Sequence, residues 1–194
     1  SEAHYLLNQA KKINPKIKTI LTGCCAQTYK DKPFDYSKID LVIGNTQKMD
    51  IVSYIEKQGF FVEDIFKEDK FLNVFLKNPK TTRVSVKIQD GCNNCCSYCI
   101  IPYARGKSRS NSIENILEQI EIVAKKGIKE IVLTGIHIGQ WGLEFNKKLV
   151  DLLREIEKTS IHRYRLGSLY ISELDDEMIE FLRKIGRASC RERV

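Results

Sequence analysis

The chain has 194 residues, 42% of them hydrophobic, which is enough for one or two folded domains and excludes a disordered composition. Its apolar runs are only a few residues long and it opens on a polar segment, so we expect no membrane span, no signal peptide and a cytoplasmic location. The net charge of +7 fits a polyanionic partner such as RNA, although a lysine-rich surface is also ordinary solvation.

The amino-terminal third alternates between helical and strand patterns. The expected elements are a helix over 2–13, strands over 18–22 and 39–45, a helix over 48–58 and a strand from residue 60. This alternation predicts a small parallel α/β domain over 1–66. Cys24 and Cys25 stand at the carboxyl end of its first strand, where ligands often bind, but the residues alone favour an interpretation as two small buried side chains.

After a lysine-rich linker over 67–83, strand and helix patterns alternate again. We expect strands over 84–89, 129–133 and 163–169, and helices over 112–126, 147–158 and 175–182. Asn111 and Glu114 suggest a capping box for the first of these helices, and Gly127 its end. Three β-α units predict part of a (β/α) barrel over 84–183, with the loops that follow its strands on one face.

The first of these loops carries three cysteines, Cys92, Cys96 and Cys99, in the spacing C-x3-C-x2-C. Three thiolates can hold three irons of a 4Fe–4S cluster and leave the fourth iron open for chemistry. Because Cys95 also pairs with Cys92 in a C-x2-C spacing, as Cys96 does with Cys99, a zinc site stays open as an alternative. A disulfide is disfavoured for a cytosolic chain with adjacent cysteines.

Two further segments supply candidate binding residues. The stretch 134–142 is glycine-rich, so its backbone can approach a ligand closely, and His137 and Trp141 within it either face a substrate or pack. Arg105 and Arg109 offer planar forks for carboxylate or phosphate, or else form a solvated basic loop.

With Tyr98 as the aromatic residue, the motif resembles the radical S-adenosylmethionine (SAM) signature C-x3-C-x-aromatic-C. The longer run over 86–106 is similar to the methylthiotransferases, most of all to the branch that modifies threonylcarbamoyl-adenosine 37 of tRNA. That branch has an aromatic residue where this chain has Cys95. We therefore take Cys92, Cys96 and Cys99 as the ligands of the SAM cluster, and Tyr98 as a cofactor-binding residue.

The resemblance also implies roles outside the cysteine loop. The run Thr22-Gly23-Cys24-Cys25-Ala26-Gln27 matches a family motif in which Cys24 would be one of three ligands to a second 4Fe–4S cluster. Thr134, Gly135, Arg105 and Ser168 match positions that bind SAM. After Ser168 the family has Leu-Glu-Pro, whereas this chain has Leu169-Tyr170-Ile171.

The implied reaction is the addition of a methylthio group to C2 of the modified adenosine. One electron from the cluster would cleave SAM to a 5′-deoxyadenosyl radical, and the second cluster would supply sulfur. We expect tRNA and a flavodoxin-like reductant as partners. Alternatives are methylthiotransferases for isopentenyl-adenosine 37 or for a ribosomal-protein aspartate, and a zinc-stabilised RNA-binding module without chemistry.

Both ends of the chain carry expectations of their own. Residues 184–194 back-translate into the read-through of a common sequencing-library adapter, so we expect this segment to be an artefact. The chain opens at Ser1 without an initiator methionine, and we expect an internal fragment that lacks two ligands of the second cluster and cannot complete methylthiolation alone.

Overall fold

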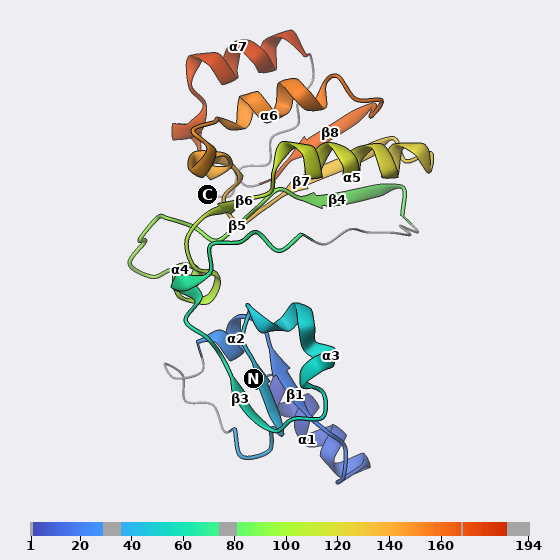
Figure 1. Ribbon diagram of the computed structural model, residues 1–194, viewed down its shortest axis with the longest axis vertical. Helices are drawn as coiled ribbons and strands as arrows, with labels where there is room; N and C mark the ends of the chain where they lie inside the picture. Colours follow the sequence, from blue (N-terminus) through green and yellow to red (C-terminus); the bar gives the residue numbers. More distant parts are fainter. Residues whose placement is uncertain (1, 29–35, 74–80, 168, 186–194) are drawn as a thin grey trace. The chain divides into compact units, whose positions relative to one another are not determined.

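The computed structural model describes residues 2–28, 36–73, 81–167 and 169–185 (Figure 1). The chain divides into two compact units. We call residues 1–68 with 96–106 the first unit, and residues 69–95 with 107–194 the second unit. Each unit has its own parallel sheet.

The first unit is built on three short strands in the order β1-β2-β3, all parallel. Its elements are α1 Glu2–Ile13, β1 Ile20–Thr22, α2 Cys24–Gln27, β2 Leu41–Ile43, the 3-10 helix η2 Gln47–Asp50, α3 Ile51–Tyr54, β3 Gly59–Phe61, η3 Ile65–Lys67 and α4 Ile101–Arg105. Strand β2 is buried along its whole length because it is the central strand, and its continuous apolar run fits that position. The helix expected over 48–58 is shorter: a 3-10 turn leads into α3, which ends at Tyr54.

The second unit is built on a parallel sheet in the order β4-β7-β8, joined by a two-stranded antiparallel pair, β5 with β6. Its elements are β4 Arg83–Lys87, β5 Gln89–Asp90, β6 Arg109–Ser110, α5 Ile113–Lys125, β7 Glu130–Thr134, η4 Ile138–Gln140, η5 Leu143–Phe145, α6 Leu149–Ile156, β8 Arg163–Leu166, η6 Ile171–Glu173 and α7 Asp176–Lys184. Helices α5, α6 and α7 lie on one side of this sheet (Figure 1).

One apolar core holds the second unit together. Alternate residues of β4 and β7 point into it, including Val84, Val86, Ile131 and Leu133. The helices supply the other side of the core. Helix α5 does so through an apolar stripe with a period of 3.6 residues, for example Ile116, Ile120 and Val123, and α6 contributes all of its residues except those on its polar face. A sheet whose strands each lead into a covering helix is the arrangement of a partial (β/α) barrel, so the predicted fold class is confirmed.

Two local predictions need correction. The strand expected over 84–89 is interrupted at Ile88, because β4 pairs with β7 whereas β5 turns to pair with β6. The N-cap of α5 is Ser112, whose hydroxyl accepts from the Asn115 amide at 3.2 Å, and not Asn111. Asn111 is buried instead, and its carbonyl accepts from the Trp141 indole. The expected end at Gly127 is confirmed by its φ of 80°.

Within the described residues, no helix is both long and apolar enough to cross a membrane. The proposed domain limits at 66, 83 and 183 remain a prediction. Residues 186–194, which make up most of the suspected artefact, lie outside the described residues.

Candidate functional site

The cysteine motif runs across both units. Cys92 and Cys95 belong to the second unit, whereas Cys96 and Cys99 belong to the first. None of the six cysteines in the described part of the chain forms a disulfide, and none of the three expected ligands is fully buried. Thiols outside disulfides that are not fully buried fit a 4Fe–4S cluster in the chemistry of their donors. Among the described residues, no three His, Cys, Asp or Glu side chains are grouped closely enough to hold a metal ion.

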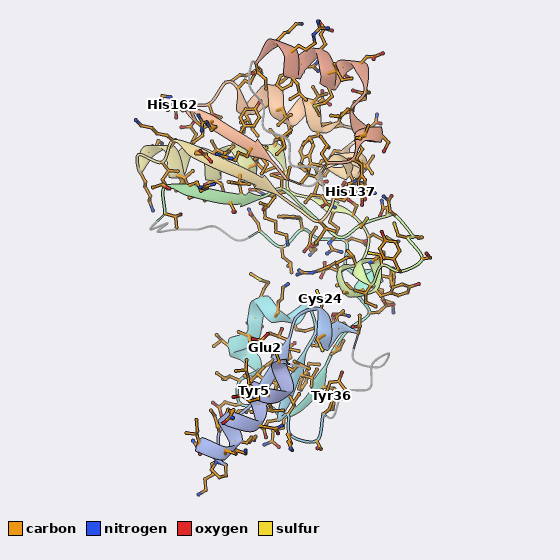
Figure 2. The ribbon with its side chains drawn as sticks, turned by 180° about the vertical axis from the view of Figure 1, so that it is seen from behind. Glu2, Tyr5, Cys24, Tyr36, His137 and His162 are labelled. Atoms are coloured by element: carbon orange, nitrogen blue, oxygen red, sulfur yellow. The ribbon has the colours of Figure 1, made fainter. Side chains whose placement is uncertain are left out.

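In the second unit, polar side chains gather where β4, β7 and β8 end. His137 lies at this end of the sheet, and His162 marks the opposite end (Figure 2). The His137 imidazole is 4% exposed, and its Nδ1 is 3.6 Å from the Cys92 sulfur. Its Nε2 faces the Glu173 carboxylate, and its ring stacks edge-on against Tyr170 with centroids 4.5 Å apart. His137 therefore links the cysteine loop to the segment after β8.

Two buried glutamines complete this polar cluster. Gln89, fully buried, donates from Nε2 to the Gly91 carbonyl at 2.8 Å and accepts from the His137 amide at 2.8 Å. Gln140 accepts from the Asn93 amide at 2.9 Å and donates to Asn94 Oδ1 at 3.0 Å. Gln140 of η4 thus bonds the two residues that follow Cys92, and Gln89 of β5 bonds Gly91, which precedes it.

The glycine-rich loop over 134–142 packs closely against neighbouring side chains. A Cβ on Gly135 would lie 2.9 Å from Gln89 Oε1 and 2.9 Å from Ile138 Cγ2. Gly139 has the Glu173 carboxylate directly against its Cα, where a Cβ would clash. A Cβ at Gly135 would therefore meet buried side chains, and a Cβ at Gly139 would displace the carboxylate end of the Glu173 side chain.

Trp141 packs and does not face a substrate. Its side chain is fully buried in the core of the second unit, and its indole donates to the Asn111 carbonyl at 2.9 Å. Nearby, Glu144 accepts from both the amide and the hydroxyl of Ser110 and holds η5 against β6. Arg109 is buried as well and donates to the Lys107 carbonyl.

In the first unit, the segment 96–106 is a turn followed by a short helix. The Cys99 amide donates to the Cys96 carbonyl at 3.0 Å, and Pro102 lies in the first turn of α4, where its missing N–H costs nothing. Tyr98 is 92% exposed, and Arg105 is partly buried at the end of α4. Its neighbour Gly106 adopts a φ of 76° and ends the helix.

Cys24 is the first residue of α2, directly after β1 (Figure 2). Gly23 precedes it with a φ of 89°, a conformation that favours glycine. Helix α2 packs against α4, and the side-chain amide of Asn45 donates to the Ala104 carbonyl of α4. The first unit therefore packs the helix that begins at Cys24 against the helix that follows Cys99.

The roles assigned from sequence to Cys24, Cys92, Cys96, Cys99, Tyr98, Arg105, Thr134 and Gly135 stay predictions. Thr134 ends β7 and Gly135 follows it, at the carboxyl edge of the sheet. Ser168 lies outside the described residues. Sequence patterns did not point to three residues of the cluster, Gln89, Gln140 and Glu173. Their only sequence signal is that polar residues stand just after strand ends.

Residues 86–191 match the sequence profile of the Radical SAM superfamily. This chain belongs to that superfamily. Its cofactors are accordingly a 4Fe–4S cluster and SAM, as expected from the motif. A solved structure of the radical SAM methyltransferase TsrM from Kitasatospora setae aligns with 98% of this chain and 43% of its own, with a TM-score of 0.63 at 17% identity, which supports the fold.

Among curated proteins, the chain is similar to methylthiotransferases. It is 37% identical to the threonylcarbamoyladenosine tRNA methylthiotransferase MtaB of Aquifex aeolicus (strain VF5) over 90% of this chain and 44% of the relative. It is 34% identical to the ribosomal protein uS12 methylthiotransferase RimO of Acetivibrio thermocellus over 83% of this chain and 39% of the relative. The chain thus spans less than half the length of these relatives.

Proposed function

We propose that this chain is the SAM-cleaving part of a methylthiotransferase that acts on C2 of threonylcarbamoyl-adenosine 37 in tRNA. The similarity to MtaB, which extends over 90% of the chain and includes the cysteine motif, is the observation that carries this proposal. The net charge of +7 agrees with a tRNA partner. A tRNA substrate and a soluble reductant of the flavodoxin kind also imply work in the cytoplasm.

Cys92, Cys96 and Cys99 would hold the cluster, whose role when bound is to deliver one electron to SAM. The chain's own residues prepare the site. Glycines 135 and 139 let Gln89, Ile138 and Glu173 pack directly against the backbone of the loop after β7. The buried Trp141 seals the apolar core beneath this loop from water.

Cys24 would be one ligand of the sulfur-donating cluster. Its place at the amino end of α2 after a glycine leaves the thiol partly exposed and able to bind metal. Arg105 carries a guanidinium that suits the carboxylate of SAM or a phosphate of RNA.

The first experiment is anaerobic reconstitution with iron and sulfide, followed by EPR of the reduced protein with and without SAM. We expect about four irons per chain, as a 4Fe–4S cluster requires, and a signal that changes when SAM is added. Zinc in place of iron, or a cluster indifferent to SAM, would remove the radical reaction and leave an RNA-binding module.

A second experiment addresses the substrate. The formation of 5′-deoxyadenosine is measured with tRNA that carries threonylcarbamoyl-adenosine 37, with tRNA that carries isopentenyl-adenosine 37, and with ribosomal protein uS12. We expect the largest stimulation by the first. Because RimO is also similar to this chain, uS12 is the favoured alternative, and a response to uS12 alone would replace the tRNA assignment.

A further inference from the structure

Gln140 is a buried residue of the second unit whose side chain hydrogen-bonds to the cysteine loop. Its side chain is 7% exposed and stands at the end of η4, just beyond β7. The amide oxygen accepts from the Asn93 backbone at 2.9 Å, and the amide nitrogen donates to Asn94 Oδ1 at 3.0 Å. One side chain therefore holds both residues that follow Cys92.

Other polar contacts also hold this loop, such as that of Asn94 Nδ2 with His137 Nδ1 at 3.5 Å. Residues 91–95 form neither helix nor strand, and Asn93 and Asn94 are exposed, so apolar burial does not determine their path. The Asn93 side chain accepts from the Ser108 amide at 2.9 Å, which ties it to the segment before β6. The path of the loop thus depends on a few hydrogen bonds to buried or backbone groups.

We propose that Gln140 is a positioning residue for the SAM cluster. By fixing the backbone at Asn93 and Asn94, it sets the direction of the Cys92 thiol toward iron. The inference rests on the proposed function only in taking Cys92 as a ligand. Groups that orient a metal ligand from outside the coordination shell typically change metal retention about 10- to 100-fold when they are removed.

The chain offers a closely matched control. Gln119 of α5 is also 7% exposed and donates to Asn73 Oδ1 at 2.8 Å. The same change can therefore be made at both glutamines, Gln140→Met and Gln119→Met, at equal burial. Gln140→Glu is the intermediate variant, because its carboxylate still accepts from the Asn93 amide but cannot donate to Asn94.

The experiment measures how fast reconstituted protein loses iron to excess bathophenanthroline disulfonate under anaerobic conditions. We expect Gln140→Met to lose iron about 10- to 100-fold faster than the parent, Gln140→Glu to fall between them, and Gln119→Met to match the parent. The EPR spectrum of the reduced cluster should change in Gln140→Met and stay unchanged in Gln119→Met, which a merely structural role would not produce.

Equal rates of iron loss in Gln140→Met and Gln119→Met would overturn the inference while leaving the proposed function intact. If Gln140→Met fails to fold by its thermal transition, Gln140→Glu decides: a parent-like rate overturns the inference and a faster rate supports it. A parent chain that binds no iron at all would overturn both the inference and the proposed function.

Discussion

The two units of this chain are stabilised in different ways. In the second unit, one large apolar core joins the sheet β4-β7-β8 to its helices. In the described part of the first unit the buried hydrophobic residues are fewer: Ala26, Leu41, Val42, Ile43, Ile65 and Ala104. Polar contacts add to this smaller set, such as those of Asp40 with Thr19 and Lys11. Since apolar burial is the main stabilising contribution, the second unit is the firmer scaffold, and the first unit should open more easily.

Substitution of the cysteines should have the largest effect, and it concerns both units. The proposed ligands Cys92 and Cys99 belong to the second and the first unit, respectively. We expect Cys92→Ala and Cys99→Ala each to reduce reconstituted iron to near zero. Cys95→Ala is the control in the same loop and should keep parent-like iron. Loss of iron in Cys95→Ala together with zinc binding by the parent would favour the zinc alternative.

Two aromatic residues test the contrast in packing. Trp141→Ala should cost about 3–5 kcal/mol, because it leaves a large cavity in the core of the second unit and frees the Asn111 carbonyl. Tyr98→Ala should change stability by less than about 0.5 kcal/mol, because Tyr98 is 92% exposed. Urea unfolding followed by circular dichroism measures both. A small cost for Trp141→Ala would show that the core of the second unit repacks.

Gly135→Ala is a smaller change within the same scaffold. The new Cβ would meet Gln89 and Ile138, both fully buried, so neither side chain can move freely away. Overpacking of this kind costs about 1–3 kcal/mol. Urea unfolding again gives the cost. An unchanged midpoint would mean that Gln89 shifts, and the His137 amide would then lose its acceptor.

Most of the architecture could be predicted from the sequence. Hydrophobic periodicity placed the long elements of the second unit, because α5 and α6 have clear apolar stripes and β7 alternates. Short elements were harder: η2 and α3 together replace one expected helix, and the break at Ile88 follows from pairing with β6, a contact that no local pattern encodes.

The sequence pointed to the cysteines of the proposed site and not to the residues that support them. The spacing of Cys92, Cys96 and Cys99 is a local property of the sequence and favours a cluster, with a zinc site as the alternative, and their role as ligands stays a prediction. Gln140, by contrast, meets Asn93 across 47 positions, and Glu173 meets His137 across the turn after β8. Such partners are set by the tertiary fold, so a single sequence shows them only as polar residues near strand ends.

The last prediction concerns the effect of acid on the stability of the first unit. The Asp40 carboxylate accepts from the Thr19 hydroxyl and amide, each at 2.7 Å, and pairs with Lys11 at 3.2 Å. The hydrogen bonds from Thr19, more than the Lys11 charge, lower the pKa of Asp40 to about 2 from 3.8. A lowered pKa means that the ionised form stabilises the fold above pH 3.8 and that this contribution disappears as the pH falls toward 2.

Asp40→Asn should therefore weaken the first unit by about 1 kcal/mol near pH 7, a value reduced by the partial exposure of the pair. The difference from the parent should shrink below pH 3.8. Hydrogen exchange of the Leu41 amide, measured from pH 6 down to 3, follows the first unit alone, and Leu133 of β7 serves as the reference in the second unit. Because the bonds of Asp40 with Thr19 and Lys11 lie within the first unit, Leu133 should keep the same protection in the variant. If the difference in Leu41 protection between variant and parent stays constant over this pH range, the substitution acts through the changed geometry of the hydrogen bonds and not through the lost charge.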